Sequence, residues 1–167
     1  AVVAAAADEA VALRVQNLFS GPRFRVYTST DPLGVEIGGA VKNVIAIAVG
    51  ASDGLGFGDN TRAALITRGL AEVTRFGVAL GATPATFAGL SGAGDLIVTC
   101  TSHHSRNYTV GARLGRGELI GDILDSMRMV AEGVWNAKVI HALGRQHGVE
   151  MPITDTVYAL CYQNLPA

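Results

Sequence analysis

Cysteine and excess charge are both scarce in this sequence. Only two of its 167 residues are cysteines, Cys100 and Cys161, and their placement fits neither a disulfide framework nor a zinc motif. Lysine and arginine total 13 against 14 aspartates and glutamates, which gives a formal net charge of −1. A charge so close to zero offers no electrostatic attraction for nucleic acid or an anionic membrane. We therefore expect no nucleic-acid partner, and the two unpaired thiols fit a reducing, cytoplasmic location.

Long apolar runs are missing as well. No uninterrupted apolar run approaches the roughly 20 residues that a transmembrane helix needs. The first ten residues, AVVAAAADEA, contain neither methionine nor a basic segment, so they do not have the pattern of a secretory signal peptide. The sequence therefore predicts no membrane span.

Small and apolar residues are what the sequence has in abundance. Apolar residues make up 49% of the chain and charged residues only 16%, which is typical of a globular protein and not of a disordered one. Aromatic residues account for only 6%, whereas glycine occurs 21 times. We therefore expect helices that pack closely through small side chains.

The first 31 residues have the pattern strand, helix, strand. Residues 2–7 are typical of a buried strand, residues 10–19 have apolar side chains at helical spacing, and FRVYT (24–28) follows a Gly-Pro turn. Two parallel strands alone do not make a stable sheet. We therefore predict that residues 1–31 are the C-terminal remnant of a larger α/β domain, and that residues 32–167 form a helical domain.

Beyond residue 31 the pattern is helical, so we predict a mainly α fold in which an all-helical domain follows a short βαβ unit. Capping residues, glycines and prolines mark the helix ends. Arg68 and Glu72, one turn apart on one helix, are predicted to form an exposed ion pair. GLSGAG (89–94) is predicted to be a loop or a close backbone contact. The predicted helices lie at 34–50, 59–80, from 84 onward, 95–100, 106–114, 132–146 and 154–163.

One lysine stands in an otherwise apolar and small stretch, GVEIGGAVKNVIAIAVG (34–50). A helix of this composition would be surrounded by protein, and unpaired ammonium groups are rarely buried because losing their hydration is costly. Lys42, which Asn43 follows directly, is therefore expected to face a partner group or a cavity. The alternative is a lysine whose stem is buried while its head reaches water.

Two further polar clusters lie at predicted helix starts. Asp95 follows GLSGAG with Thr99 one turn on, and Ser105, Arg106 and Asn107 open another helix. Backbone N–H groups, a hydroxyl, a guanidinium and an amide at a helix N-terminus suit a phosphate group. A plainer explanation also exists for each cluster, in which Asp95 and Ser105 are simple N-caps and Arg106 is a surface charge.

Taken together, these clusters resemble a known family. In order and spacing the sequence is similar to the C-terminal half of bacterial NAD(P)-dependent glycerol-3-phosphate dehydrogenase, over essentially its whole length. The first thirty residues resemble the last βαβ unit of that family's Rossmann domain, and the rest resembles its helical substrate domain. The matching stretches are GGAVKNVIAIAVGASDGLGFGDNTRAALITRGLAE (38–72), GLSGAGDLIVTCTS (89–102), HSRN (104–107), VAEG (130–133) and GVEMPIT (148–154).

Two features of the family do not occur in these 167 residues. One is the GxGxxG fingerprint of the family's N-terminal half, and the other is the family's usual final helix, because the sequence ends at NLPA. We therefore expect this chain by itself to lack most of the cofactor site and to be inactive.

The resemblance implies that dihydroxyacetone phosphate and sn-glycerol 3-phosphate are interconverted by hydride transfer with NAD or NADP, a step that supplies glycerophospholipid precursors. It implies that Lys42 is the general acid/base, that no metal takes part, and that a homodimer can form. His103 and His104 are expected to be surface or supporting groups. The substrate-binding residues that it implies are Lys42, Asn43, Asp95, Thr99, Ser105, Arg106 and Asn107, and the cofactor-binding residues are Arg106, Val130 and Glu132.

Two other interpretations stay open. A related two-domain dehydrogenase, of the 2-hydroxyacid or ketopantoate reductase type, also has a helical domain that supplies a lysine, although it would not need SRN beside GDL. A helical packing or dimerisation module without catalysis of its own would also fit the missing fingerprint.

Overall fold

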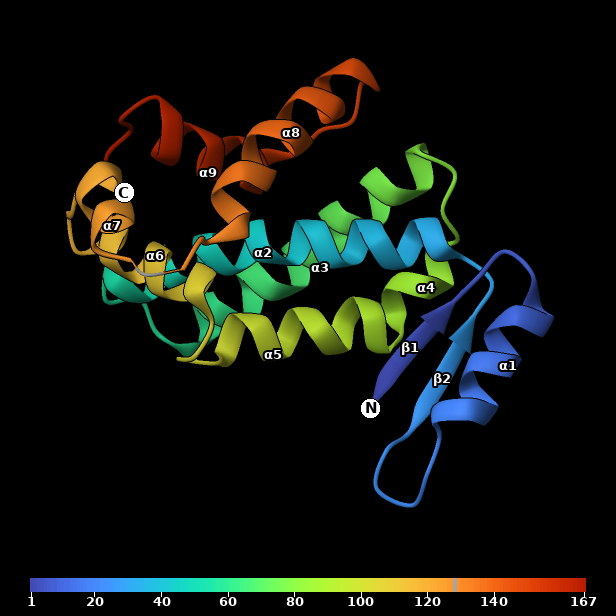
Figure 1. The fold of residues 1–167 in the computed structure, drawn as a ribbon. Helices are drawn as coiled ribbons and strands as arrows, with labels where there is room; N and C mark the ends of the chain where they lie inside the picture. The colour runs from blue at the N-terminus through green and yellow to red at the C-terminus, as the bar shows by residue number, and fades with distance from the viewer. Residues whose placement is uncertain (128) are drawn as a thin grey trace.

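The computed structural model describes residues 1–127 and 129–167, and most of them are helical (Figure 1). A βαβ unit lies at one end and a body of helices forms the rest, which confirms the fold class predicted from the sequence. The elements in chain order are β1 (Val2–Ala5), α1 (Glu9–Phe19), β2 (Val26–Ser29), α2 (Pro32–Gly54), α3 (Asp59–Ala79), α4 (Pro84–Ala88), the π-helical turn η1 (Leu90–Gly94), α5 (Asp95–Thr101), α6 (Arg106–Gly115), α7 (Ile120–Ser126), α8 (Glu132–Gln146) and α9 (Pro152–Tyr162).

The βαβ unit has two parallel strands with α1 beside them (Figure 1). The register pairs Val2 with Val26, and α1 begins where Asp8 Oδ1 accepts a hydrogen bond from the backbone N–H of Ala10 (2.9 Å). Each strand has four residues. Both are shorter than the runs predicted from the sequence, because ladder hydrogen bonds form only where the two strands overlap.

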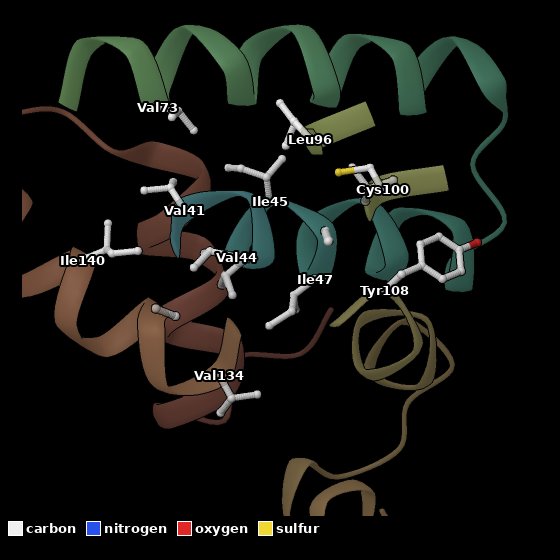
Figure 2. Close-up of a cluster of buried hydrophobic side chains, with 14 of the residues drawn as sticks. Val41, Val44, Ile45, Ile47, Val73, Leu96, Cys100, Tyr108, Val134 and Ile140 are labelled. Atoms are coloured by element: carbon white, nitrogen blue, oxygen red, sulfur yellow. The ribbon is translucent and has the colours of Figure 1, made fainter. Parts of the chain in front are cut away.

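α2 is the central helix of the body. Helices α3, α5, α6 and α8 pack around it (Figure 1). From Val41 to Ile47 every residue except Lys42 is buried. Figure 2 shows the side chains of Val41, Val44, Ile45 and Ile47 leaving α2 in different directions to meet neighbours on several sides. A helix that is apolar all round is buried in this way because each of its faces must be covered.

Of the described helices, only α2 is long and apolar enough to cross a membrane, with 23 residues. However, 61% of its most apolar window is buried inside the protein. The helices packed around α2 therefore make it a core helix.

α2 and α6 cross with their backbones in contact. A Cβ atom added at Gly111 would lie 2.0 Å from the carbonyl oxygen of Ile47, and one added at Gly50 would lie 2.1 Å from the carbonyl oxygen of Tyr108. Neither distance is compatible with a side chain, so both helices need glycine where they cross. The close packing expected from the high glycine content is found where α2 and α6 cross.

Glu72 is buried, so the predicted exposed ion pair with Arg68 is wrong. Its side chain is only 2% exposed. The carboxylate accepts hydrogen bonds from the backbone N–H groups of Ile153 (2.9 Å) and Thr154 (2.9 Å) and from Thr154 Oγ1 (2.7 Å). These N–H groups lie in the first turn of α9 and have no partner within that helix. Glu72 thus supplies the N-terminal cap of α9 from a distant part of the chain.

Three local predictions also change. GLSGAG is not a loop but the close backbone contact that was the other alternative, because a Cβ atom at Gly92 would lie 2.1 Å from the carbonyl oxygen of Phe87. η1 continues directly into α5, and single π-helical turns of this kind occur often at functional sites. α9 begins at Pro152, two residues before its predicted start. α7 was not predicted, because its N-cap position is Leu119, which has no side chain that could cap the helix and mark its start.

Asp31 joins the start of α2 to the start of α4. Its carboxylate accepts hydrogen bonds from the backbone N–H groups of Gly34 (2.9 Å) and Thr83 (2.8 Å) and from Thr86 Oγ1 (2.7 Å). Burial by itself would raise the pKa of Asp31, but these hydrogen bonds outweigh burial and hold the pKa below its ordinary value.

We expect Asp31→Ala to lower the free energy of unfolding by about 1 to 2 kcal/mol, because α2 loses its N-cap and its link to α4. The pKa is lower in the folded state than the unfolded value of roughly 3.9, so the carboxylate stabilises the fold above that pH. This contribution is lost as the pH falls through the folded-state pKa. Urea unfolding should therefore show the full difference from wild type at pH 7 and a smaller one below about pH 4.

Asp8→Ala is the matched control, because Asp8 caps α1 without a hydrogen bond to another helix. It should cost less, on the order of 0.5 to 1 kcal/mol. If the difference in free energy of unfolding between wild type and Asp31→Ala were the same at pH 7 and below about pH 4, the ionised carboxylate would not be what stabilises the fold.

Candidate active site

Lys42 projects from α2 toward the first residue of α5. Its Nζ donates a hydrogen bond to Asp95 Oδ2, and the two side chains form an ion pair in which they are 21% and 37% exposed. The ammonium is therefore neither alone in the core nor free in water, and the sequence-based alternative of a simple snorkelling lysine does not apply. Thr99 lies one turn along α5, where its Oγ1 donates to the carbonyl oxygen of Asp95 (2.6 Å).

Asn43 and Asn107 face each other across the α2–α6 contact. Asn107 Nδ2 donates to Asn43 Oδ1 (3.0 Å), and both residues are 8% exposed. Asn107 Oδ1 accepts from the backbone N–H of Gly133 in the first turn of α8 (2.8 Å). The two amides thus connect three helices of the body.

The start of α6 is built as the sequence predicts. Ser105 is the N-cap, and its Oγ accepts a hydrogen bond from the backbone N–H of Tyr108 (3.3 Å). Arg106 is the first helical residue, and no carboxylate within residues 1–127 and 129–167 lies at ion-pair distance from its guanidinium. The N-terminus of this ten-residue helix and an uncompensated guanidinium therefore lie side by side.

These groups share one cavity of about 460 Å³. Lys42 and Asn43 reach it from α2, the SRN cluster reaches it from the start of α6, and Glu132 reaches it from the start of α8. The lining residues are Gly39, Lys42, Asn43, Val98, Thr99, Ser102, His104, Ser105, Arg106, Asn107 and Glu132.

Most of the residues predicted from the sequence therefore meet in one place. Asp95 is held at this cavity through its ion pair with Lys42. Val130 does not line the cavity, and its side chain is 60% exposed. Sequence reasoning missed Ser102, and it treated His104 as a surface or supporting group. The proximity of both to Ser105 in the chain was the signal that could have included them.

The cavity combines two kinds of chemistry. Arg106, the N-terminus of α6 and the amide groups offer donors to an anion. Lys42, beside the Asp95 carboxylate, offers a proton that can be given or taken. An oxygen-rich anion that exchanges a proton at a second position would use both.

Comparison with known proteins identifies the protein family in which this cavity occurs. Residues 31–167 match the family described as the C-terminus of NAD-dependent glycerol-3-phosphate dehydrogenase. The chain belongs to this family. Membership in the glycerol-3-phosphate dehydrogenase family sets aside the alternative of a 2-hydroxyacid or ketopantoate reductase.

Named relatives and solved structures agree with the family match. The chain is 63% identical over 167 residues to glycerol-3-phosphate dehydrogenase [NAD(P)+] of Geobacter sulfurreducens, covering 100% of this chain and 50% of that one. It is 59% identical over 165 residues to the protein of the same name from Lacticaseibacillus paracasei, covering 99% and 47%. The chain thus spans about half the length of the curated relatives that it matches.

Among solved structures, the crystal structure of glycerol-3-phosphate dehydrogenase from Coxiella burnetii matches with a TM-score of 0.93 and 41% identity, covering 97% of this chain and 50% of that one. The glycerol-3-phosphate dehydrogenase of Saccharomyces cerevisiae matches with a TM-score of 0.83 and 31% identity, covering 91% and 45%.

The residues present fit only part of a dinucleotide site. The family depends on NAD(P)+. Of the residues expected to touch this cofactor, Arg106 and Glu132 line the cavity, whereas Val130 lies outside it. The 167 residues contain no GxGxxG sequence, which is the element that holds the pyrophosphate in Rossmann domains.

No group of three or more His, Cys, Asp or Glu side chains is arranged as metal ligands in the described part of the chain. Burial raises the pKa of the Cys100 thiol to about 12, so this thiol stays protonated at neutral pH.

Proposed function

We propose that residues 32–167 are the substrate-binding and catalytic domain of an NAD(P)-dependent glycerol-3-phosphate dehydrogenase, and that residues 1–31 complete its nucleotide-binding domain. The reaction interconverts dihydroxyacetone phosphate and sn-glycerol 3-phosphate. The observation that carries the proposal is that Lys42, which is paired with Asp95, lines the same cavity as Arg106. The boundary at residue 31 is supported by the family match, which begins there, and by the hydrogen bonds of Asp31 at the start of α2.

Lys42 is the proposed general acid/base. A nicotinamide cofactor, when bound, would supply or accept the hydride. When hydride adds to the ketone carbon, the carbonyl oxygen becomes an alkoxide and takes a proton from Lys42 Nζ. In the opposite direction the neutral amine removes the hydroxyl proton. Asp95 orients Nζ, and Thr99 completes the wall on the α5 side.

Arg106 is the proposed anchor for the phosphate. A guanidinium can donate two parallel hydrogen bonds to phosphate oxygens, and Ser105 and Asn107 add neutral contacts around it. Asn43 lines the same cavity beside Asn107, where its amide can also contact the substrate. Glu132, with Arg106 and Val130, is proposed to border the cofactor.

The setting in the cell is part of the same proposal. Cys100 and Cys161 are both free, which supports a reducing compartment such as the cytoplasm. The product would supply glycerophospholipid synthesis.

A homodimer stays a prediction, which sedimentation velocity can test.

We expect the 167-residue chain alone to show no measurable dehydrogenase activity, because these residues contain no pyrophosphate loop. A chimaera that joins them to the half of the Geobacter sulfurreducens enzyme outside the match should reduce dihydroxyacetone phosphate within tenfold of a typical roughly 10 per second. The test is a steady-state assay with saturating NADH or NADPH, and 2-oxo acids serve as control substrates.

Turnover at that rate by the 167-residue chain alone would contradict the proposal that cofactor binding requires the other half of the enzyme. A folded chimaera that reduces the 2-oxo acids and leaves dihydroxyacetone phosphate untouched would contradict the proposed substrate.

A further inference from the structure

The two buried asparagines belong to a chain of hydrogen bonds that we call the amide relay. It starts at the backbone N–H of Gly133, passes through the side chains of Asn107 and Asn43, and ends at the carbonyl oxygen of Gly39. The donor-to-acceptor distances along it are 2.8 Å, 3.0 Å and 3.2 Å.

Both ends of the amide relay have a fixed polarity. A backbone N–H can only donate, so the atom of Asn107 that faces Gly133 must be its oxygen. Nδ2 of Asn107 then faces Asn43, whose side-chain oxygen must accept the hydrogen bond. Nδ2 of Asn43 is left to face the carbonyl of Gly39, which can only accept. Rotating either amide by half a turn would set donor against donor or acceptor against acceptor at a buried position.

This order decides what the cavity can recognise. Each side-chain amide carries two N–H donors and uses one of them within the relay. Asn43 and Asn107 both line the cavity, so each has one N–H left for a ligand while both amide oxygens are engaged. This part of the wall therefore donates to an oxygen-rich ligand such as a phosphate ester or a developing alkoxide.

We infer that Gly133 is a positioning residue, whose backbone N–H fixes both amides as donors toward the substrate. The identity of that substrate rests on the proposed function, whereas the relay itself does not. A side chain does not fit here, because a Cβ atom at Gly133 would lie 2.5 Å from the carbonyl oxygen of Asn43 and 2.8 Å from Asn107 Oδ1. Gly133→Ala must therefore push α8 away from Asn107 and open the relay.

Asn136 offers a matched control on the same helix. Its Nδ2 donates to the carbonyl oxygen of Ala40 (3.1 Å), so it also ties α8 to α2, but it is not part of the relay. Asn136→Ala should therefore loosen the helix contact without turning either amide.

The kinetic test compares these variants in the chimaera. Gly133→Ala should lower kcat/KM for dihydroxyacetone phosphate at least tenfold, and Asn136→Ala less than threefold. In an Asn107→Ala background, adding Gly133→Ala should lower kcat/KM by a smaller factor than it does alone, because the relay is already broken and only the contact with the Asn43 carbonyl oxygen remains. Equal losses from Gly133→Ala with and without Asn107 would overturn the inference, and so would equal losses from Gly133→Ala and Asn136→Ala.

A second test needs no activity and uses the 167-residue protein labelled with ¹⁵N-asparagine. Gly133→Ala should shift the side-chain amide resonances of both Asn43 and Asn107, and Asn136→Ala should shift neither. Asn107→Asp keeps an acceptor for Gly133 but removes the donor that faces Asn43, so it should shift the Asn43 amide even if Gly133→Ala does not fold.

The two tests separate the possible failures. Unshifted amide resonances would overturn the relay itself. Shifted resonances with unchanged kinetics would overturn the positioning role. Shifted resonances in the 167-residue protein, together with a folded chimaera that has no dehydrogenase activity, would count against the proposed function and not against the relay.

Discussion

Lys42→Ala in the chimaera is expected to lower kcat for dihydroxyacetone phosphate reduction at least about 100-fold, the scale of a lost general acid/base. The change in KM for the ketone should be modest, because Nζ matters most when the alkoxide forms. Lys42→Arg should not restore the rate, since a guanidinium does not exchange its proton near neutral pH. Steady-state kinetics at saturating cofactor measure all three quantities.

The control for Lys42 is the chain's one other lysine, Lys138. Its Nζ lies 5.8 Å from the centre of the Tyr162 ring, and it does not line the cavity. Lys138→Ala should leave kcat within about twofold of wild type, as is typical of surface substitutions. If Lys42→Ala kept nearly full kcat, Lys42 would be a structural residue paired with Asp95.

Arg106→Ala is expected to impair the reduction of dihydroxyacetone phosphate much more than the reduction of unphosphorylated dihydroxyacetone. A charge-assisted hydrogen bond to a phosphate contributes roughly 1.5 to 3 kcal/mol, or about one to two decades in affinity. KM for dihydroxyacetone phosphate should therefore rise strongly, while unphosphorylated dihydroxyacetone has no phosphate group for Arg106 to bind. The ratio of the two kcat/KM values, wild type against variant, is the quantity to measure, because weaker cofactor binding in the variant would affect both ketones alike.

Arg116 provides the control at the other end of α6. It is exposed, its nearest carboxylate is Glu118 at 4.0 Å, and it does not line the cavity. Arg116→Ala should leave the ratio unchanged. The same ratio in wild type and Arg106→Ala would mean that the phosphate binds elsewhere, and the role assigned to the start of α6 would be wrong.

Two helix starts could be predicted directly from the sequence. Ser105 caps α6 and Pro84 opens α4 as expected. Such signals are reliable because a cap acts within three or four residues of itself, so the information lies in one short stretch of sequence. α7 was not predicted because Leu119, at its N-cap position, gives no such signal.

The candidate residues could also be found from the sequence, because a lysine in an apolar helix and an SRN cluster at a helix start are unusual for their surroundings. Their roles remain predictions. What the sequence could not show is which groups meet. Lys42 and Asp95 are 53 residues apart, and Asn43 and Asn107 are 64 apart.

Glu72 shows why the tertiary structure was needed. By local spacing it belongs to an exposed pair with Arg68. Its carboxylate instead caps a helix that begins about 80 residues later, by accepting hydrogen bonds from the backbone N–H groups of Ile153 and Thr154. Local sequence determined the starts of helices that have a clear capping signal, and it determined which side chains can carry a charge or exchange a proton. The packing around α2 decided which side chains face one another, because burial leaves a polar group stable only where a distant segment supplies its partner.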